Sequence, residues 1–181
     1  MYRLYQILFV FLLFFASCED NNDVPDAKGN ITISSEIFGT NLYYVNGYSF
    51  EEDKFVPSLN SGGSVPDIIP VNVLLVSGDV TGMILSASED GSGLYKNFES
   101  SNIKEAEGFF NNYRMVDAAN FTSLSDTLET GQVYTFKTYK DNYVKFLVED
   151  VRLMSGSLLK DYVEADIKYY IQRDGSQEFD E

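Results

Sequence analysis

Alternation of apolar and polar residues near the C-terminus constrains the fold of this chain more than any other sequence feature. Residues 143–148 and 162–171 each place apolar side chains at every second position, and residues 133–139 form a third run beside them. A period of two, with one apolar and one polar side, is typical of antiparallel strands that have one face in water. Residues 132–171 therefore predict a three-stranded meander as the framework of the fold.

Upstream of the meander, two long runs predict a pair of neighbouring strands. Residues 67–76 are the most apolar stretch outside the leader, and residues 80–87 return from a Ser-Gly-Asp turn as their partner. Pro70 cannot donate a backbone hydrogen bond, so we expect the first half of the first run at a sheet edge or bulge.

The N-terminal part of the domain predicts shorter strands and one tight turn. Residues 31–37 alternate at first, and residues 42–45 form a continuous, mainly aromatic run. Asn46 and Gly47 both tolerate positive φ, so they predict a two-residue hairpin turn between Tyr44 and Tyr48. Residues 51–54 predict a further turn or an exposed strand end.

One segment alone predicts a helix. Asn102 can cap it together with Glu105, and four mainly apolar residues fall on one helical face. These residues are Ile103, Ala106, Phe110 and Tyr113. We expect an α-helix over residues 103–115 that packs on the sheet. The predicted fold class is all-β and antiparallel, with this one short α-helix.

The first seventeen residues predict a signal peptide that is not part of the fold. Arg3 supplies a positive charge, and residues 7–16 form an apolar run that is short for a membrane span. Cys18, the only cysteine, follows directly and is similar to the cysteine of a bacterial lipobox, where the thiol takes a lipid such as palmitate. The alternative is an ordinary secretory signal or an anchor helix with an incidental cysteine.

This pattern predicts the organisation and location of the protein. We expect residues 18–29 to form a lipidated flexible tether and residues 30–181 to form a single β-rich domain. Acidic residues at 19–23 resemble the signal that sends some Gram-negative lipoproteins to the outer face of the outer membrane, although a solvated linker would look the same. The predicted location is the bacterial outer membrane, facing outside.

Charge restricts the partners that this chain can have. Removing the leader takes one arginine from 13 basic residues, which leaves 12 against 28 acidic residues and a net charge of −16. Such a charge repels the phosphates of nucleic acid and of anionic lipid. We therefore expect no nucleic-acid partner, and membrane attachment only through the lipid on Cys18.

The residue inventory argues against catalysis. The chain has no histidine, which excludes Ser-His-Asp and Cys-His catalysis and imidazole metal sites. Serine–lysine and paired-carboxylate chemistry remain open, but no acidic pair lies in a known catalytic motif. The acidic, glycine-rich residues 89–93 lack the ligand spacing of an EF-hand and predict a solvated turn. We expect neither an enzyme nor a metal site.

Three pieces of the chain resemble the HmuY-like family of haem-binding bacterial surface lipoproteins. Residues 133–146 and 165–179 are similar to the closing pattern of that family, with Asn142 where the pattern has glycine. Residues 48–50 and 67–69 resemble two earlier strands. Together these pieces cover less than half of the mature chain. The resemblance implies an all-β fold and a protein that captures haem outside the cell.

The resemblance also implies two axial haem ligands from the middle of the chain, which are histidines in some family members and methionines in others. Because histidine is absent, the expected pair is Met83 and Met115, with Tyr113 and Met154 as alternative ligands. Methionine in an apolar strand or at a helix end is otherwise usually a core residue.

Two functional hypotheses follow from the sequence. The first is a lipid-anchored haem-capture protein, for which an outer-membrane receptor is a candidate partner. The second is a non-catalytic surface module of the same fold that binds a protein, a glycan or another small ligand. Dependence of binding on the methionines distinguishes the two. Residues 126–128 also resemble an O-glycosylation sequence of such lipoproteins.

Overall fold

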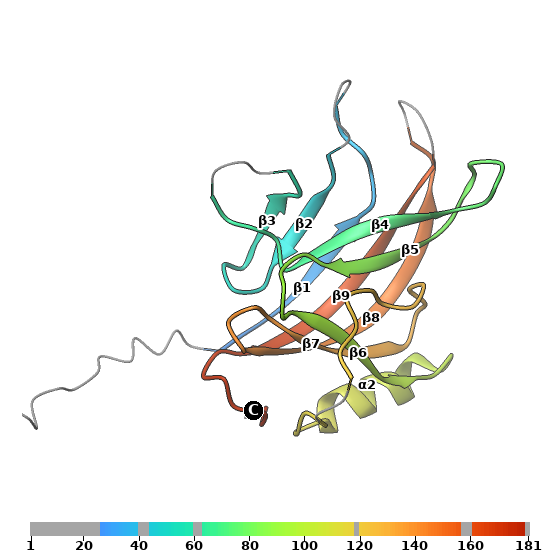
Figure 1. The fold of residues 1–181 in the computed structure, drawn as a ribbon. Coiled ribbons are helices and arrows are strands. Elements are labelled where there is room, and N and C mark those ends of the chain that lie inside the picture. Colours follow the sequence, from blue (N-terminus) through green and yellow to red (C-terminus); the bar gives the residue numbers. More distant parts are fainter. Residues whose placement is uncertain (1–25, 40–43, 60–62, 118–119, 157–160, 180–181) are drawn as a thin grey trace, which may run out of the picture.

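Two antiparallel sheets pack face to face in the computed structural model, which describes residues 26–39, 44–59, 63–117, 120–156 and 161–179 (Figure 1). One sheet has the strand order β1-β9-β8-β7-β6 and the other the order β3-β2-β4-β5. The elements are β1 (Ala27–Ser34), β2 (Asn46–Ser49), β3 (Lys54–Pro57), β4 (Ile68–Leu74), β5 (Val80–Ala87), β6 (Gly93–Glu99), α2 (Ile103–Asn112), β7 (Gln132–Lys137), β8 (Tyr143–Met154) and β9 (Tyr162–Gln172). Over the described residues, the predicted all-β fold with one short helix is confirmed.

The predicted C-terminal meander forms the centre of the five-stranded sheet. β7 pairs with β8 and β8 pairs with β9, both antiparallel, while β1 adds to the outer edge of β9. The core between the two sheets is rich in aromatic rings: Phe50 of the turn after β2 contacts Phe136, Phe146 and Tyr169 at 5.3–6.4 Å between ring centroids. Such contacts between the sheets fix their relative position.

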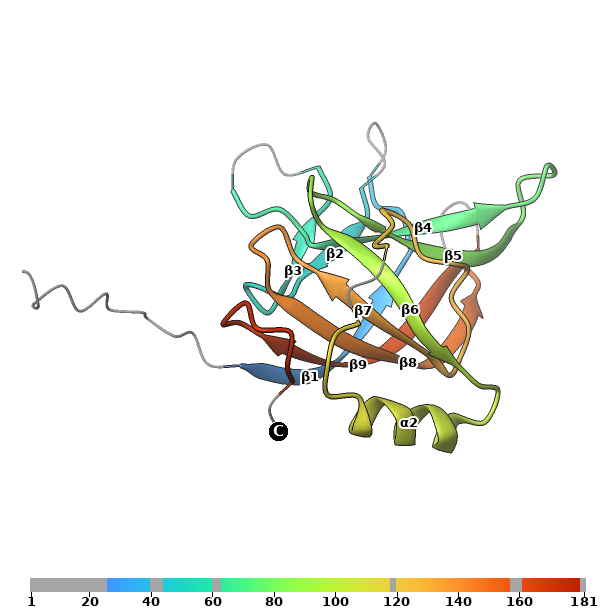
Figure 2. The ribbon, with the colours of Figure 1, turned by 60° about the horizontal axis from the view of Figure 1, so that its bottom comes forward.

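The prediction that the meander has one face in water is wrong for its central strands. α2 lies against the outer face of the five-stranded sheet (Figure 2). Ala106 and Phe110 of the helix form a second core cluster with Val133 and Leu147 of the sheet. Both faces of β7 and of the first half of β8 are therefore buried.

Lys145 is fully buried in this second cluster because it completes the C-terminal end of α2. Its Nζ donates to the carbonyl oxygens of Phe110 at 3.1 Å and Tyr113 at 3.0 Å. Its ammonium group also lies 5.2 Å from the ring centroid of Phe179. A cation at this end of a helix satisfies carbonyl groups that have no partner within the helix.

The helix begins where the sequence predicts and ends earlier. The Asn102 side chain accepts a hydrogen bond from the backbone N–H of Lys104 and donates to Glu105 at 3.1 Å, as expected for a capped start. The last helical residue is Asn112, whereas the prediction extends to residue 115. Tyr113 has extended backbone angles, so Met115 lies beyond the helix in an isolated bridge with Glu178.

The predicted Asn46-Gly47 turn is wrong, because both residues lie in β2 and pair with β3. A Cβ atom on Gly47 would lie 2.5 Å from the carbonyl oxygen of Ile68, so the glycine permits close approach of β4 instead of a turn. The β2–β3 turn falls at residues 50–53, where Asp53 has a φ of 52°.

Three further differences concern the N-terminus and the connecting segments. β1 begins at Ala27, so the predicted tether over residues 18–29 extends three residues into the fold. β6 was not predicted at all. The polar connection before β7 extends both sheets at one edge, because Thr122 pairs with Leu94 and Leu124 pairs with Ser86.

In the part of the chain that the structure describes, no helix has the length and apolar character needed to cross a bilayer.

Candidate functional site

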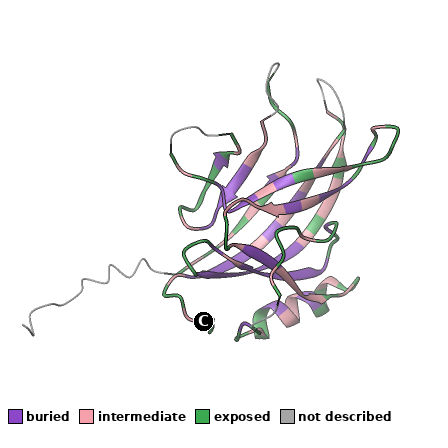
Figure 3. Ribbon diagram, viewed as in Figure 1, coloured by how far each residue is buried: buried purple, intermediate pink, exposed green. Residues whose placement is uncertain are grey.

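Exposed apolar side chains gather at one end of the sandwich. Three segments supply them: the chain after β1, the tip of the β4–β5 hairpin, and the end of β8. We call this group the apical patch, and each member has at least 44% of its surface exposed. The patch consists of Ile37, Phe38, Leu74, Leu75, Val76 and Leu153. Figure 3 shows the exposed tip of the β4–β5 hairpin.

Strand register brings the three segments to the same end. Ser34, at the end of β1, pairs with Glu164 near the start of β9, and Met154 at the end of β8 pairs with Tyr162. Asn72 of β4 is tied to the residue after β1, because its Nδ2 donates to the Ser35 carbonyl oxygen at 3.2 Å. Figures 1 and 2 both place the ends of these strands on the same side of the molecule.

A tight turn holds the hairpin tip in its extended position. The backbone N–H of Leu75 donates to the Asp79 carbonyl oxygen at 2.9 Å, and that of Gly78 donates to the Leu75 carbonyl oxygen at 2.9 Å. Gly78 has a φ of 88°, which glycine adopts readily. The apolar residues of the tip thus belong to an ordered, hydrogen-bonded hairpin.

The start of the domain lies at the opposite end. Ala27, the first residue of β1, pairs with Ile171, and the neighbouring pair Tyr143–Gln172 closes the same end of the sheet (Figure 1). β1 runs the length of the sheet from Ala27 to Ser34. The apical patch and the start of the domain at Ala27 therefore lie at opposite ends of the domain.

Carboxylates surround the apical patch. Glu36 precedes Ile37, Asp79 closes the hairpin turn, and Asp161 and Glu164 flank Tyr162. Partial burial, and then the carboxylates of Glu36 and Glu164, raise the pKa of the Tyr162 phenol.

Arg152 is the cation that lies among these carboxylates. Its guanidinium group contacts Asp150 at 2.9 Å and Glu164 at 3.3 Å, and it also pairs with Asp166. One positive charge among three negative ones leaves a local excess of negative charge.

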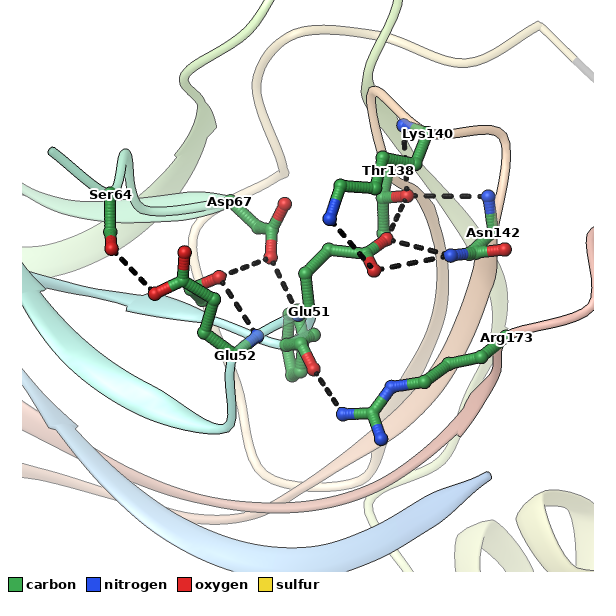
Figure 4. A network of polar contacts seen from close by, with 10 residues as sticks. Glu51, Glu52, Ser64, Asp67, Thr138, Lys140, Asn142 and Arg173 are labelled. Atoms are coloured by element: carbon green, nitrogen blue, oxygen red, sulfur yellow. Dashed lines mark hydrogen bonds and ion pairs between the residues drawn. The ribbon is translucent and has the colours of Figure 1, made fainter. Parts of the chain in front are cut away.

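A buried polar network lies at the opposite end and joins the β2–β3 turn to the β7–β8 turn (Figure 4). The Glu51 carboxylate accepts from Thr138 Oγ1 at 2.6 Å and from Asn142 Nδ2 at 2.9 Å, and Lys140 Nζ lies 3.9 Å away. Asn142 thus binds Glu51 at the position where the family pattern has glycine. The positive φ of this hairpin, 64°, falls on Asp141 instead.

Asp67 is the second buried carboxylate of the network. It accepts hydrogen bonds from Ser49 Oγ and from the backbone N–H of Glu51, each at 3.2 Å. Burial raises the pKa of Asp67 to about 6, and the nearby Glu51 carboxylate adds to the shift. Both carboxylates have protein donors, so the network stabilises the contact between two turns.

The structure does not bring the predicted haem ligands together. Met83 is completely buried in the core between the two sheets, whereas Met115 has 59% of its surface exposed beside the helix, on the other side of the five-stranded sheet. Tyr113 also lies on the helix side, where its hydroxyl accepts from Asn97 at 2.8 Å. Met154 ends β8 at the apical end.

Three predictions remain: the lipidation site, the glycosylation-like sequence and the absence of a metal site. Cys18 lies outside the described residues. Thr127 of the glycosylation-like sequence is exposed. Among the residues described, no group of three acidic or cysteine side chains is placed to hold a metal ion.

No protein-family model matches this chain, and a search of curated proteins finds no significant match.

Sequence reasoning did not find the apical patch. The run over residues 67–76 predicts a strand with its first half at a sheet edge or bulge, but the strand ends at Leu74 and the apolar run continues into the turn. The signal was present in the order of residues: Leu75 and Val76 directly precede Ser77-Gly78-Asp79, and apolar residues in a turn are expected to be exposed.

Proposed function

We propose that this chain is a lipid-anchored, non-catalytic module of the bacterial cell surface that binds a macromolecular partner through the apical patch. The observation that carries the proposal is the gathering of exposed apolar side chains from three separate segments at one end of the domain. Exposed apolar patches with a polar rim mark interaction sites in folded proteins.

The position of the patch fits attachment through Cys18. The lipid on Cys18 would hold the end of the domain that contains Ala27 near the membrane, since few residues separate the two. The apical patch would then face away from the bilayer. A surface presented in this way is accessible to partners outside the cell.

Placement of the methionines supports the second of the two hypotheses, a surface module that binds a protein, a glycan or another small ligand, over haem capture by Met83 and Met115. A haem iron requires both axial ligands within bonding distance of one atom. Met83 and Met115 lie on different sides of the five-stranded sheet. Haem capture stays a separate prediction, which a haem titration tests.

The anchor is tested by Cys18→Ala in the full chain. The expected result is loss of the protein from the membrane fraction, together with loss of a lipid-modified N-terminal peptide in mass spectrometry. Added protease should digest the wild-type protein on intact cells. Retention of the variant in the membrane, or complete protection from protease, would contradict the proposed location.

Binding is tested by site-specific photo-crosslinking in cells. A benzoylphenylalanine residue in place of Leu75 should give a discrete crosslinked protein, and one in place of Leu59 should not. Leu59 is a matched control because it is equally exposed, at 56% against 55%, but lies outside the patch. Equal crosslinking from both positions, or none from either, would contradict the proposal.

A further inference from the structure

We infer that the partner of the apical patch is a protein whose contact surface has an apolar centre and a rim of lysine or arginine. This inference rests on the proposed function and adds the chemistry of the partner. It follows from the two properties of the patch that appear together, exposed apolar side chains and surrounding carboxylates.

The apolar centre of the interface comes from the β4–β5 hairpin. Leu74, Leu75 and Val76 are consecutive, and the tight turn that follows them keeps all three exposed. Ile37 and Leu153 extend the apolar surface from the neighbouring strand ends. Burial of such residues at the centre of an interface supplies most of its affinity, while a surrounding polar rim excludes water.

The rim is acidic on more than one side. Glu36 lies beside Ile37, Asp79 lies at the base of the hairpin tip, and Glu164 lies between Tyr162 and Arg152. Ser77 Oγ donates to the Asp79 carboxylate at 2.6 Å, which leaves the second carboxylate oxygen for an external donor. Complementary charge on the partner would speed association and fix its orientation.

The same charges disfavour other occupants. A second copy of this chain would place two acidic rims against each other, which costs free energy. A bilayer of anionic lipid would be repelled in the same way, as would nucleic acid. A basic protein surface with an apolar centre satisfies both properties of the patch.

The test uses residues 19–181, which contain every described element of the fold, and two synthetic amphipathic helical peptides. One peptide consists of leucine and lysine and the other of leucine and glutamate, and fluorescence anisotropy reports binding. The leucine–lysine peptide should bind at least about tenfold more tightly. Leu75→Ser with Val76→Ser should weaken that binding about tenfold.

Two control variants separate the patch from net charge. Phe55→Ser with Leu59→Ser removes exposed apolar side chains elsewhere and should leave binding unchanged. Glu36→Gln with Asp79→Asn should reduce the salt dependence of binding. Asp90→Asn with Glu107→Gln changes the net charge equally and should not. Thermal unfolding of each variant checks that the fold is kept, as expected for surface substitutions.

Several outcomes would overturn the inference. Equal weakening by the patch and control variants would assign binding to the overall negative charge. Tighter binding of the leucine–glutamate peptide would indicate that the rim of the partner's contact surface is acidic and not basic. Self-association in sedimentation that is lost with Leu75→Ser and Val76→Ser would assign the patch to a second copy of the chain. Binding to phosphatidylglycerol vesicles that is lost with the same substitutions would assign it to a membrane. If crosslinking from Leu75 in cells persists in any of these cases, the proposed function stands while the inference about the partner fails.

Discussion

Lys145 shows how the surroundings of a single residue can reverse its expected exposure. The alternating pattern of β8 places Lys145 on the polar side of the strand, yet its ammonium group is buried between the sheet and α2. The carbonyl groups of Phe110 and Tyr113 at the end of α2, together with three aromatic rings, surround the charge. A buried charge with such partners is tolerated, and its removal leaves carbonyl groups without a donor.

Lys145→Met should therefore lower the free energy of unfolding by about 2 kcal/mol or more. The measurement is urea denaturation at neutral pH, followed by circular dichroism. Lys104→Met, on the exposed side of the same helix, is the control and should change stability by less than about 0.5 kcal/mol. Equal stability of the Lys145 variant and the wild type would contradict the role of Lys145 at the helix end.

Asp67 predicts a specific pH dependence of stability. Its pKa is about 6 in the folded state, against an ordinary value of 3.8. Between these values the folded state keeps a proton that the unfolded state has lost, so the contribution of Asp67 to stability falls as pH rises from about 4 to about 6. The loss amounts to about 3 kcal/mol.

Asp67→Asn should remove this loss, because an amide does not ionise. Relative to the wild type, the variant should gain stability as pH rises from 4 to 6, and the difference should stay constant above pH 7. Urea denaturation at a series of pH values measures it. Ser49→Ala removes one hydrogen bond to the carboxylate but keeps its ionisation, so that variant should retain the slope. Parallel pH profiles for Asp67→Asn and the wild type would be inconsistent with the raised pKa.

At the scale of strands and turns, Gly47 tests the close contact between β2 and β4. A methyl group there would lie 2.5 Å from the Ile68 carbonyl oxygen and 2.5 Å from Pro66 Cβ. Gly47→Ala should destabilise the protein by about 1–3 kcal/mol, as is typical of overpacking. Gly108→Ala is the matched control in α2, where nothing lies within 4 Å of the new group. That substitution should stabilise by up to about 1 kcal/mol. Similar effects of both substitutions in thermal unfolding would contradict the close approach.

The strands that the sequence predicts are those with a long alternating or a long apolar run. β8 and β9 keep a period of two over most of their length, and the β4–β5 pair is rich in apolar residues. β6 contains an irregularity between Lys96 and Phe98, which shifts the register and breaks the alternation. β3 has four residues, which are too few to show a period. Gly47 fits either a turn or a close approach, and only the position of β4 decides between them.

The apical patch could not be predicted in the same way, because it depends on contacts between distant segments. Ile37, Leu75 and Leu153 come together only through the register of β1 with β9, of β8 with β9, and the hydrogen bond from Asn72 to the residue after β1. Local sequence patterns indicate which face of a strand is buried, but they do not show that β1 pairs with β9, which lies far away in the sequence. The helix was predictable because its cap and its apolar face are local.

At the scale of the whole molecule, the separation of Met83 from Met115 predicts the outcome of a haem titration. Residues 19–181 should show no saturable low-spin spectrum of haem with two methionine ligands, in either the oxidised or the reduced state. The measurement is absorbance of the Soret and visible bands during titration. A saturable Soret band that disappears with both Met83→Ala and Met115→Ala would contradict this and support haem capture through that pair.

The central claim is that the apical patch is the binding surface, and mapping by NMR tests it most directly. The sample is residues 19–181 with labelled Ile, Leu and Val methyl groups, titrated with the leucine–lysine peptide. We predict that the largest shifts fall on Ile37, Leu74, Leu75, Val76 and Leu153, while Leu59 and Val65 stay unchanged. Shifts spread evenly over the surface, or concentrated outside the patch, would contradict the claim.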